Sequence, residues 1–566
     1  MRTELRFLLA IGMMFIVLVG TNMLFPPIVP EPGIVPDSLG STAPTGSVGS
    51  PPSSTVTGAP PAAVVAGAQV VPAPEVLAET RVTVESPLYH LEFSSYGARL
   101  VSAELPRFRA LNQEGVVDLV PAATPGYFGQ ALVVGNDTLD LARAPFTVEP
   151  AGGLSLAEGG SGGTLRFTYE DPASALRFVV SYTFDPGLYV MSVEGRVEGV
   201  DRPLLLTDLG EGLAFAEADS AGEARMMAYA YNHLDRGIES TALTRAEPQI
   251  VQGPLLWAAF RSKFFVTVLL AGESDATTDG TDYLGGLILR PGTIPDRVGI
   301  ATAQGVGTDG RFAYRLFLGP QEYASLSSLG QDLEEVNPYG WRFLRPVLRP
   351  IVSVILTILT FLHTNLAIGY GWVLIVFGVA MRIVLFPLNH KAMKAQMRNM
   401  EVQPLLQEIQ KKYKDNPEKL QKEMLRLYKE HGFNPLAGCL PLLLPWPILI
   451  ALFFVFQNTI ELRGVAFLWL PDLSTKDPLY ILPMILAGSM FLMQWLSMKS
   501  IEAPNPQMKM MMWMMPPMML LIFLNLASGL NLYYVVSNIA TIPQQMWISN
   551  ERKKMKGRPP LKLKDD

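Results

Sequence analysis

The pattern of apolar and polar positions divides the chain into three parts, and the first part begins with an apolar run at 7–25. This run is close to the length that crosses a bilayer, follows Arg2 and Arg6, and is not followed by a small-residue cleavage pattern. Residues 1–25 therefore predict an uncleaved membrane anchor with a cytoplasmic N-terminus, and a removed signal peptide is the alternative. Residues 26–78 are rich in Pro, Ala, Gly, Val and Ser and carry almost no charge, which predicts a disordered or extended linker.

The second part, residues 79–335, consists of short alternating apolar and polar runs broken by Gly, Pro, Asn and Asp. Alternation with a period of two is typical of strands with one buried face, so a large all-β sandwich is expected. Its histidines, His90 and His233, lie in no metal-ligand spacing, and we expect both to be structural.

The third part contains longer apolar runs at helical spacing. The run at 351–362 is short for a membrane span and carries Ser and Thr on one face, so residues 338–364 predict an amphipathic helix on the outer membrane surface. The alternative is a span that turns back at Gly369. Five further runs are predicted to cross the membrane and form a core over 369–549: 369–388, 435–460, 478–497, 509–527 and 530–549.

The distribution of charge predicts which segments lie on each side of the membrane. The segment 389–432 and the tail 550–566 are rich in Lys and Arg, whereas acidic residues outnumber basic ones between 26 and 340. The positive-inside rule places the two basic segments in the cytoplasm and the β domain outside. Both termini are then cytoplasmic, which requires an even number of spans, so the helix at 338–364 should not cross.

Composition agrees with this organisation, because 49% of the 566 residues are hydrophobic and only 17% are charged. The single cysteine, Cys439, excludes an intramolecular disulfide. The expected fold class is a polytopic α-helical membrane protein of about six transmembrane helices with a large periplasmic all-β sandwich domain.

Arg382 stands within the apolar run at 369–388, where a guanidinium costs roughly 2.5–3.5 kcal/mol on insertion scales. A long side chain could snorkel from there toward the polar end near Asn389. Polar residues on other predicted spans could instead surround Arg382 in a polar cavity, although such residues also serve as interhelical hydrogen-bond partners. They are Gln457, Asn458, Gln494, Asn531, Tyr534, Ser537, Asn538, Thr541 and Gln545.

Three other features indicate a protein that handles variable apolar segments. The span at 435–460 carries four prolines, which bend a helix beside a wet cavity or only disturb packing. The methionines of 508–519 suit promiscuous apolar contacts, or are lipid-facing filler. The segment 389–432 predicts a helical hairpin that docks ribosomes, targeting factors or emerging chains, or is simply a solvated loop.

Several motifs that identify enzymes and transporters are absent from the sequence. It has no Walker loop, no zinc-protease motif, no Cys/His cluster and no paired acidic residues in the predicted spans. This argues against an ATPase, a protease or a proton-coupled transporter, and no metal or other cofactor is expected.

Six stretches together resemble the YidC/Oxa/Alb family of membrane-protein insertases, in its Gram-negative form. They are Val82–Leu105, Gly253–Leu270, Ala380–Met393, Phe433–Ile448, Asp477–Pro483 and Ser528–Asn538. The resemblance implies an insertase and not an enzyme, in the bacterial inner membrane, with a hydrophilic groove open to cytoplasm and lipid. Implied partners are nascent membrane proteins, the Sec translocon, membrane lipids and a ribosome or the signal recognition particle receptor, without specific nucleic-acid binding.

The resemblance also implies roles for individual residues. The groove is expected to contain Arg382, Gln457, Asn458, Tyr534, Ser537, Asn538 and Thr541. An apolar slide for the client's transmembrane segment is expected to contain Leu443, Trp446, Met511, Met515, Met518 and Tyr533. The cytoplasmic hairpin contributes Lys391, Met397, Tyr413, Met424 and Tyr428.

Two positions depart from some members of that family. Pro445 replaces a groove glutamine, and Gly378 replaces a threonine one turn before Arg382. Two other hypotheses remain: a channel or transporter for an anionic solute that uses Arg382, and an enzyme on the β domain. The enzyme would need histidine and carboxylate groups that converge near His90, Glu92 or His233.

Overall fold

The structure is a computed structural model that describes residues 79–272, 282–292, 297–337, 344–413, 416–430, 446–499 and 506–555. The predicted anchor, the predicted linker and most of the proline-rich segment, 435–445, lie outside the described residues.

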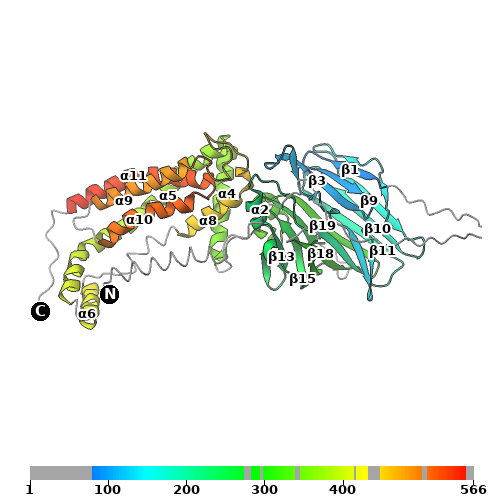
Figure 1. Cartoon of the computed structure of the whole chain (residues 1–566), viewed down its shortest axis with the longest axis horizontal. Helices are drawn as coiled ribbons and strands as arrows, with labels where there is room; N and C mark the ends of the chain where they lie inside the picture. The colour runs from blue at the N-terminus through cyan, green and yellow to red at the C-terminus, as the bar shows by residue number, and fades with distance from the viewer. Residues whose placement is uncertain are drawn as a thin grey trace, which may run out of the picture. The chain divides into compact units, whose positions relative to one another are not determined.

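The β domain contains two sheets among the described residues. The smaller one has the strand order β4-β3-β2-β1-β8 and is antiparallel except for the parallel pair β1 and β8. Its strands are β1 Arg81–Glu85, β2 His90–Ser94, β3 Arg99–Arg109, β4 Val116–Asp118 and β8 Leu154–Ser155. Figure 1 shows this sheet, in blue, beside the larger one.

The larger sheet has fourteen described strands in the order β6-β5-β12-β18-β17-β15-β16-β19-β11-β10-β9-β7, with β13 paired to β15 and β14 to β13. They are β5 Gln130–Val134, β6 Asp137–Asp140, β7 Thr147–Glu149, β9 Gly163–Glu170, β10 Arg177–Phe184, β11 Val190–Glu198, β12 Leu204–Gly210, β13 Ala228–His233, β14 Gly237–Ala242, β15 Gln249–Arg261, β16 Phe265–Ala271, β17 Leu284–Pro291, β18 Val298–Gly305 and β19 Arg311–Pro320. Short helices join or follow them: α2 Ser220–Met226, η1 Leu243–Arg245, α3 Tyr323–Ser328 and η2 Leu333–Glu335.

Side-chain alternation explains how the sheets pack. In β10, every second residue from Phe178 to Phe184 is buried, because successive side chains of a strand point to opposite faces. Phe93 of the small sheet meets Tyr182 of the large sheet with ring centroids 5.1 Å apart, so the two sheets share one core. β16 is buried at all seven positions, as expected for a strand covered on both faces.

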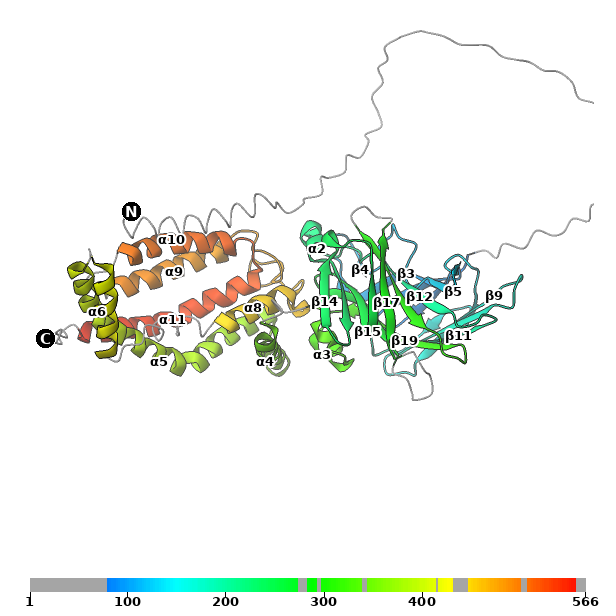
Figure 2. The same cartoon turned by 90° about the horizontal axis from the view of Figure 1, so that it is seen from below.

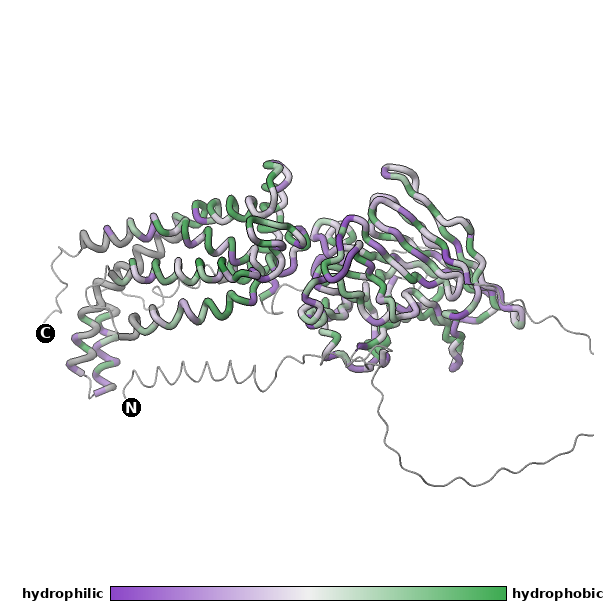
Figure 3. Tube along the Cα trace, turned by 45° about the horizontal axis from the view of Figure 1, so that its top comes forward, coloured by the Kyte–Doolittle hydropathy of each residue, from purple (hydrophilic) through white to green (hydrophobic). Residues whose placement is uncertain are grey.

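The helical part follows the β domain. Its described helices are α4 Arg345–Leu366, α5 Tyr370–Lys412, α6 Pro417–Glu430, α8 Trp446–Asn458, η3 Ile460–Leu462, α9 Ile481–Lys499, α10 Pro506–Phe523 and α11 Ser528–Met555. Figure 2 shows α9, α10 and α11 running side by side, in agreement with the contacts of α9 to both neighbours. In Figure 3, the helices carry long hydrophobic stretches, whereas hydrophobic and hydrophilic residues alternate along the strands.

The described helices can be compared with the sequence prediction. α4 overlaps the predicted helix 338–364: it has 22 residues, begins with Pro346 in its first turn and continues past the apolar run 351–362 to Leu366. α5 runs without interruption for 43 residues, roughly 65 Å, so a single helix passes from the predicted span into the hairpin. Among the described residues, α4 and Tyr370–Pro387 are long and apolar enough to cross a membrane.

The helices pack closely where residues are small. A Cβ on Gly378 of α5 would lie 3.2 Å from Val536 Cγ1 of α11, so glycine lets these two helices approach each other. Phe377, Val455, Phe456 and Tyr533 are buried in the same cluster, which joins α5, α8 and α11. This packing positions the polar residues described next.

Candidate functional site

Arg382 of α5 is directed at α11. Its Nε donates to the Oγ of Ser537 at 2.8 Å and to the carbonyl oxygen of Ser537 at 3.1 Å. Thr541, one turn later, donates its hydroxyl to the same carbonyl at 2.6 Å. Among the described residues, the two Nη groups of Arg382 have no hydrogen-bond acceptor and no carboxylate pairs with them. The guanidinium is therefore oriented through one nitrogen, and its other donors are left for a ligand or water.

An aromatic wall lies beside this pair. Tyr533, one turn before Ser537, is buried with its ring centroid 5.8 Å from those of Phe377 and Phe456. Tyr534 packs against Phe523 at 5.2 Å. Tyr533 and Tyr534 thus join helices by aromatic packing, which fixes α11 next to Arg382.

The other polar residues expected in the groove have different partners. Asn538 donates to Ser489 Oγ of α9 at 3.1 Å, and Gln494 of α9 donates to Met515 Sδ of α10 at 3.5 Å. Asn531 donates to Phe523 O at 3.0 Å. These residues are interhelical hydrogen-bond partners, one of the two roles that the sequence left open.

Gln457 and Asn458 end α8, and the buried Oδ1 of Asn458 has no partner. The structure thus brings together Arg382, Ser537 and Thr541, with Tyr533 beside them, and no contact joins Gln457, Asn458, Asn538 or Tyr534 to Arg382 among the described residues.

The slide residues are described only in part. Met515 and Met518 lie on α10 and are half-buried, but Leu443 and the side chains of Trp446 and Met511 lie outside the described residues. The large apolar side chains Ile383 and Val384, next to Arg382 on α5, are 69% and 68% exposed. The charged site therefore adjoins an apolar surface.

The hairpin has a small core of its own. Leu405 and Ile409 of α5 pack with Leu427 of α6, and Tyr413 and Met424 lie against them. The side chains of Lys391, Met397 and Tyr428 lie outside the described residues. Tyr413 and Met424 thus stabilise the hairpin from within.

The two histidines of the β domain have different surroundings. His90 lies 3.8 Å from Glu85 and 3.6 Å from Glu104 on the exposed face of the small sheet, and Glu92 pairs with Arg81 at 3.2 Å. His233 is in the other sheet, where its Nδ1 accepts from the amide of Asp235 at 3.1 Å. The described residues contain no group of three His, Cys, Asp or Glu that could hold a metal ion.

Sequence reasoning used Asp477–Pro483 only as part of the family resemblance and assigned no structural role to the segment 459–480 between α8 and α9. Asp477 is buried there, and its carboxylate accepts from the amides of Leu479 at 3.0 Å and Leu482 at 2.7 Å. An aspartate followed by proline before an apolar run is a helix-start signal that could have identified this cap. Arg463 in the same segment forms a buried ion pair with Glu217 of the β domain, for which no local signal exists.

Two family models match successive parts of the chain. The family model described as the YidC periplasmic domain matches residues 81–353, and the model described as 60Kd inner membrane protein matches residues 361–556.

The membrane protein insertase YidC of Chlorobaculum parvum is 32% identical over 501 residues, which cover 83% of this chain and 82% of that protein. The YidC of Syntrophus aciditrophicus is 29% identical over 504 residues, 86% of this chain and 87% of that protein.

Solved structures give weaker likenesses. An active YidC insertase crystal structure is 17% identical, with a TM-score of 0.33 over 83% of this chain and 93% of that one. A galactose mutarotase related enzyme from Lactobacillus acidophilus is 10% identical, with a TM-score of 0.28 over 42% of this chain and 97% of that one. Both scores are too low to argue from, so the assignment depends on the sequence matches. These matches confirm the resemblance and the predicted periplasmic β domain: the chain belongs to the YidC family of membrane protein insertases, whose named members are insertases and not enzymes.

Proposed function

We propose that this protein inserts nascent inner-membrane proteins into the bilayer and helps them fold, with Arg382 as the single positive charge of a hydrophilic groove. The observation that carries the proposal is that Arg382 is held through Nε by Ser537 while its Nη groups keep no protein partner among the described residues. A cation whose remaining donors are free attracts carboxylates and carbonyls of an incoming segment.

The physical task is to lower a barrier. A polar or acidic tail that must cross the hydrocarbon loses its hydration, at several kcal/mol per charged group. A fixed guanidinium part-way across replaces some of that hydration, so the tail crosses a shorter apolar distance. Because α5 continues into the basic hairpin, a client can approach Arg382 along one helix from the cytoplasmic side.

The apolar part of the client needs a different surface. Ile383 and Val384 on α5, and Trp513 on α10, expose large apolar side chains. Together with Met515 and Met518 they supply a slide on which hydrophobic segments of varied shape can pack, since methionine adapts to different partners. Leu443, Trp446, Met511 and Tyr533 complete this slide in our proposal.

The remaining assignments belong to the same proposal. The protein spans the inner membrane about six times, with cytoplasmic termini, and α4 lies on the periplasmic surface. Lys391, Met397, Tyr413, Met424 and Tyr428 form a hairpin that receives clients from a ribosome or the signal recognition particle receptor. The protein acts alone or with the Sec translocon. Gly378 and Pro445 leave the groove less polar than in relatives that carry threonine and glutamine there.

Reconstituted vesicles test the role of Arg382. A small client with an acidic translocated tail should insert much more slowly with Arg382→Ala, and Arg382→Lys should recover most of the rate, because the role is charge and not bidentate geometry. A client with a neutral tail is the matched control and should depend less on the arginine. Full insertion by Arg382→Ala would reduce the arginine to a snorkelling side chain, and saturable flux of an anionic solute would favour the channel hypothesis.

A further inference from the structure

The segment 459–480, which connects α8 to α9, belongs to two hydrophobic cores at once. Ile460 is buried in the core of the β domain. Leu462 and Leu473, both fully buried, lie in the core of the helical part. The connection therefore has apolar side chains buried in each of the two cores. Moving one core relative to the other would expose some of these side chains to water, so the connection keeps the two cores in a fixed relation.

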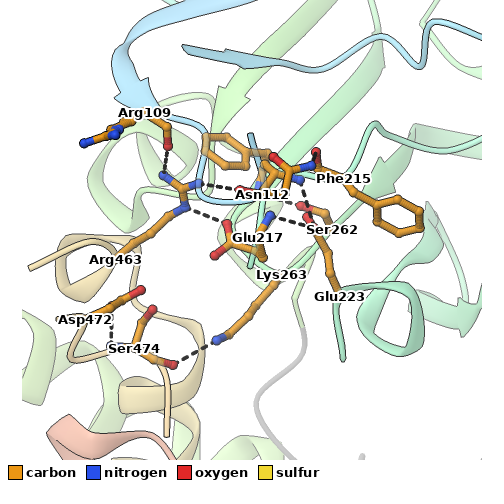
Figure 4. Close-up of polar contacts among 12 residues, drawn as sticks. Arg109, Asn112, Phe215, Glu217, Glu223, Ser262, Lys263, Arg463, Asp472 and Ser474 are labelled. Atoms are coloured by element: carbon orange, nitrogen blue, oxygen red, sulfur yellow. Dashed lines mark hydrogen bonds and ion pairs between the residues drawn. The ribbon is translucent and has the colours of Figure 1, made fainter. Parts of the chain in front are cut away.

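Arg463 is the polar centre of this connection, as Figure 4 shows. Its Nε lies 2.6 Å from Glu217 Oε1, and the side chains of Arg463 and Glu217 are 4% and 7% exposed. Nη1 donates to Arg109 O at 2.9 Å, and Nη2 donates to Ala216 O at 3.1 Å. The guanidinium carbon also lies 5.2 Å from the ring centroid of Phe265. Each nitrogen of the fork has a partner, which is the condition under which a buried ion pair holds one geometry.

A second cation makes the reverse contact. Lys263 of the β domain, in the turn between β15 and β16, donates from Nζ to Ser474 O of the connection at 3.0 Å. Arg463 thus reaches from the helical part into the β domain, and Lys263 reaches back (Figure 4). Two contacts of opposite direction resist rotation better than one.

The same connection holds the beginnings of three core helices. The amides of Ser528 and Gly529, which open α11, donate to Thr475 O at 2.6 Å and Leu473 O at 2.8 Å. The carboxylate of Asp477 caps α9 at Leu482 N, 2.7 Å away. Phe467 packs edge-on against Trp372 near the start of α5, with ring centroids 5.5 Å apart.

These helix starts are close to the proposed client site. Arg382 lies roughly 16 Å along α5 from Gly371, and Ser537 lies roughly 13 Å along α11 from Ser528, at 1.5 Å per residue. A shift of the connection therefore moves the two helices that carry the Arg382–Ser537 pair. We propose that Arg463 is a positioning residue: by holding the segment 459–480 on the β domain, it sets the spacing of α5 and α11 at Arg382. This inference rests on the proposed function, because it assigns a role in the same insertion step.

The test uses the full chain in vesicles with a Cys439→Ser background. Spin labels at the exposed positions Arg225→Cys on α2 and Lys476→Cys on the connection report the distance between the two parts. We expect Arg463→Met to broaden the distance distribution and to lower the maximal insertion rate roughly five- to tenfold, because loose positioning of a site costs rate. The half-saturating client concentration should stay unchanged, since Arg382 still binds the tail.

Three further variants make the result specific. Arg463→Lys keeps the charge but not the fork and should recover part of both readouts. Glu217→Gln, a milder change, serves if Arg463→Met fails to fold, and should shift both readouts in the same direction. Arg81→Met breaks an exposed ion pair of the β domain and should change neither.

The outcomes separate this inference from the proposed function. A broadened distribution with a normal maximal rate overturns the positioning role, and so does an unchanged distribution. A raised half-saturating concentration at normal maximal rate also overturns it, because that result would mean direct client binding. Arg382→Ala is measured in parallel: full insertion there rejects the proposed function, whereas slow insertion there with a normal rate for Arg463→Met rejects only the positioning role.

Discussion

Replacing Ser537 by alanine removes one of the two acceptors of Arg382 Nε and leaves the backbone carbonyl in place. The hydroxyl oxygen is the nearer acceptor, at 2.8 Å against 3.1 Å. A hydrogen bond to a charged group contributes about 1.5–3 kcal/mol net. The carbonyl keeps part of that value, although Thr541 competes for it, so we expect a loss of about 1–1.4 kcal/mol.

This loss converts to rate if Arg382 acts in an oriented state. Because 1.4 kcal/mol corresponds to a factor of ten, Ser537→Ala should insert an acidic-tailed client roughly five- to tenfold more slowly. The expected direction is a decrease, since a guanidinium freed from Ser537 gains one donor but loses the hydrogen bond that holds it in one orientation.

A double-mutant cycle isolates the pair. Insertion rates of Ser537→Ala, Arg382→Ala and the double variant should be non-additive, with a coupling energy of about 1 kcal/mol. Ser489→Ala is the matched control. Ser489 of α9 accepts a hydrogen bond from Asn538, which is on the same helix as Ser537, and Ser489 does not contact Arg382. Its effect should add to that of Arg382→Ala. Additive effects for the Ser537 cycle would refute the view that Ser537 orients Arg382 for insertion.

Two further predictions concern stability. Burial raises the pKa of Glu223 to about 7, although the hydrogen bonds that its carboxylate accepts from the amides of Glu217 and Ala216 lower this pKa. The folded state therefore holds a proton that the unfolded state releases near 4.5, so stability is full below that pH and falls by about 3 kcal/mol as pH rises to 7. The melting temperature of Glu223→Gln, measured from pH 4.5 to 7, should not show this decline. Melting temperatures of the two proteins that fall in parallel with pH would contradict the prediction. A Cβ on Gly371 would lie 2.2 Å from the Phe467 ring, so Gly371→Ala should cost about 1–3 kcal/mol in thermal unfolding. Adding Phe467→Leu should recover part of that loss, and a neutral Gly371→Ala would show that the ring moves freely.

The strands could be predicted because their signal is local. In β10, the residues of Arg177–Phe184 alternate between polar and apolar except at Val179, and the structure buries the apolar residues at every second position from Phe178 to Phe184. The partition into sheets could not be predicted, since the parallel pair Val84 and Leu154 joins segments with no sequence relation. α4 is longer than the apolar run 351–362 and ends two residues beyond the predicted helix 338–364, because an apolar run measures the buried stripe of a helix, whereas the helix itself also includes its polar turns.

The candidate site divides in the same way. Arg382 could be found because a charge within an apolar run is a local anomaly. Its partner Ser537 was one of several polar residues at helical spacing, and only packing distinguishes it from Asn538, the next residue, which faces α9. The pair of Arg463 and Glu217 is separated by 246 positions, so no property of either sequence neighbourhood could join them.

Arg463 and Arg382 show how the same residue type can have a structural role at one site and a ligand-binding role at another. Arg463 has a carboxylate on Nε and a carbonyl on each Nη group, so binding anything else would first require breaking these contacts in a buried place. Arg382 has acceptors only on Nε among the described residues, so a client can bind its Nη groups without breaking a protein contact. A fully satisfied guanidinium is suited to fixing two parts of a chain, and a partly satisfied one to receiving a ligand. The number of donors left free therefore decides which arginine can present its charge to a client and which can only position the other.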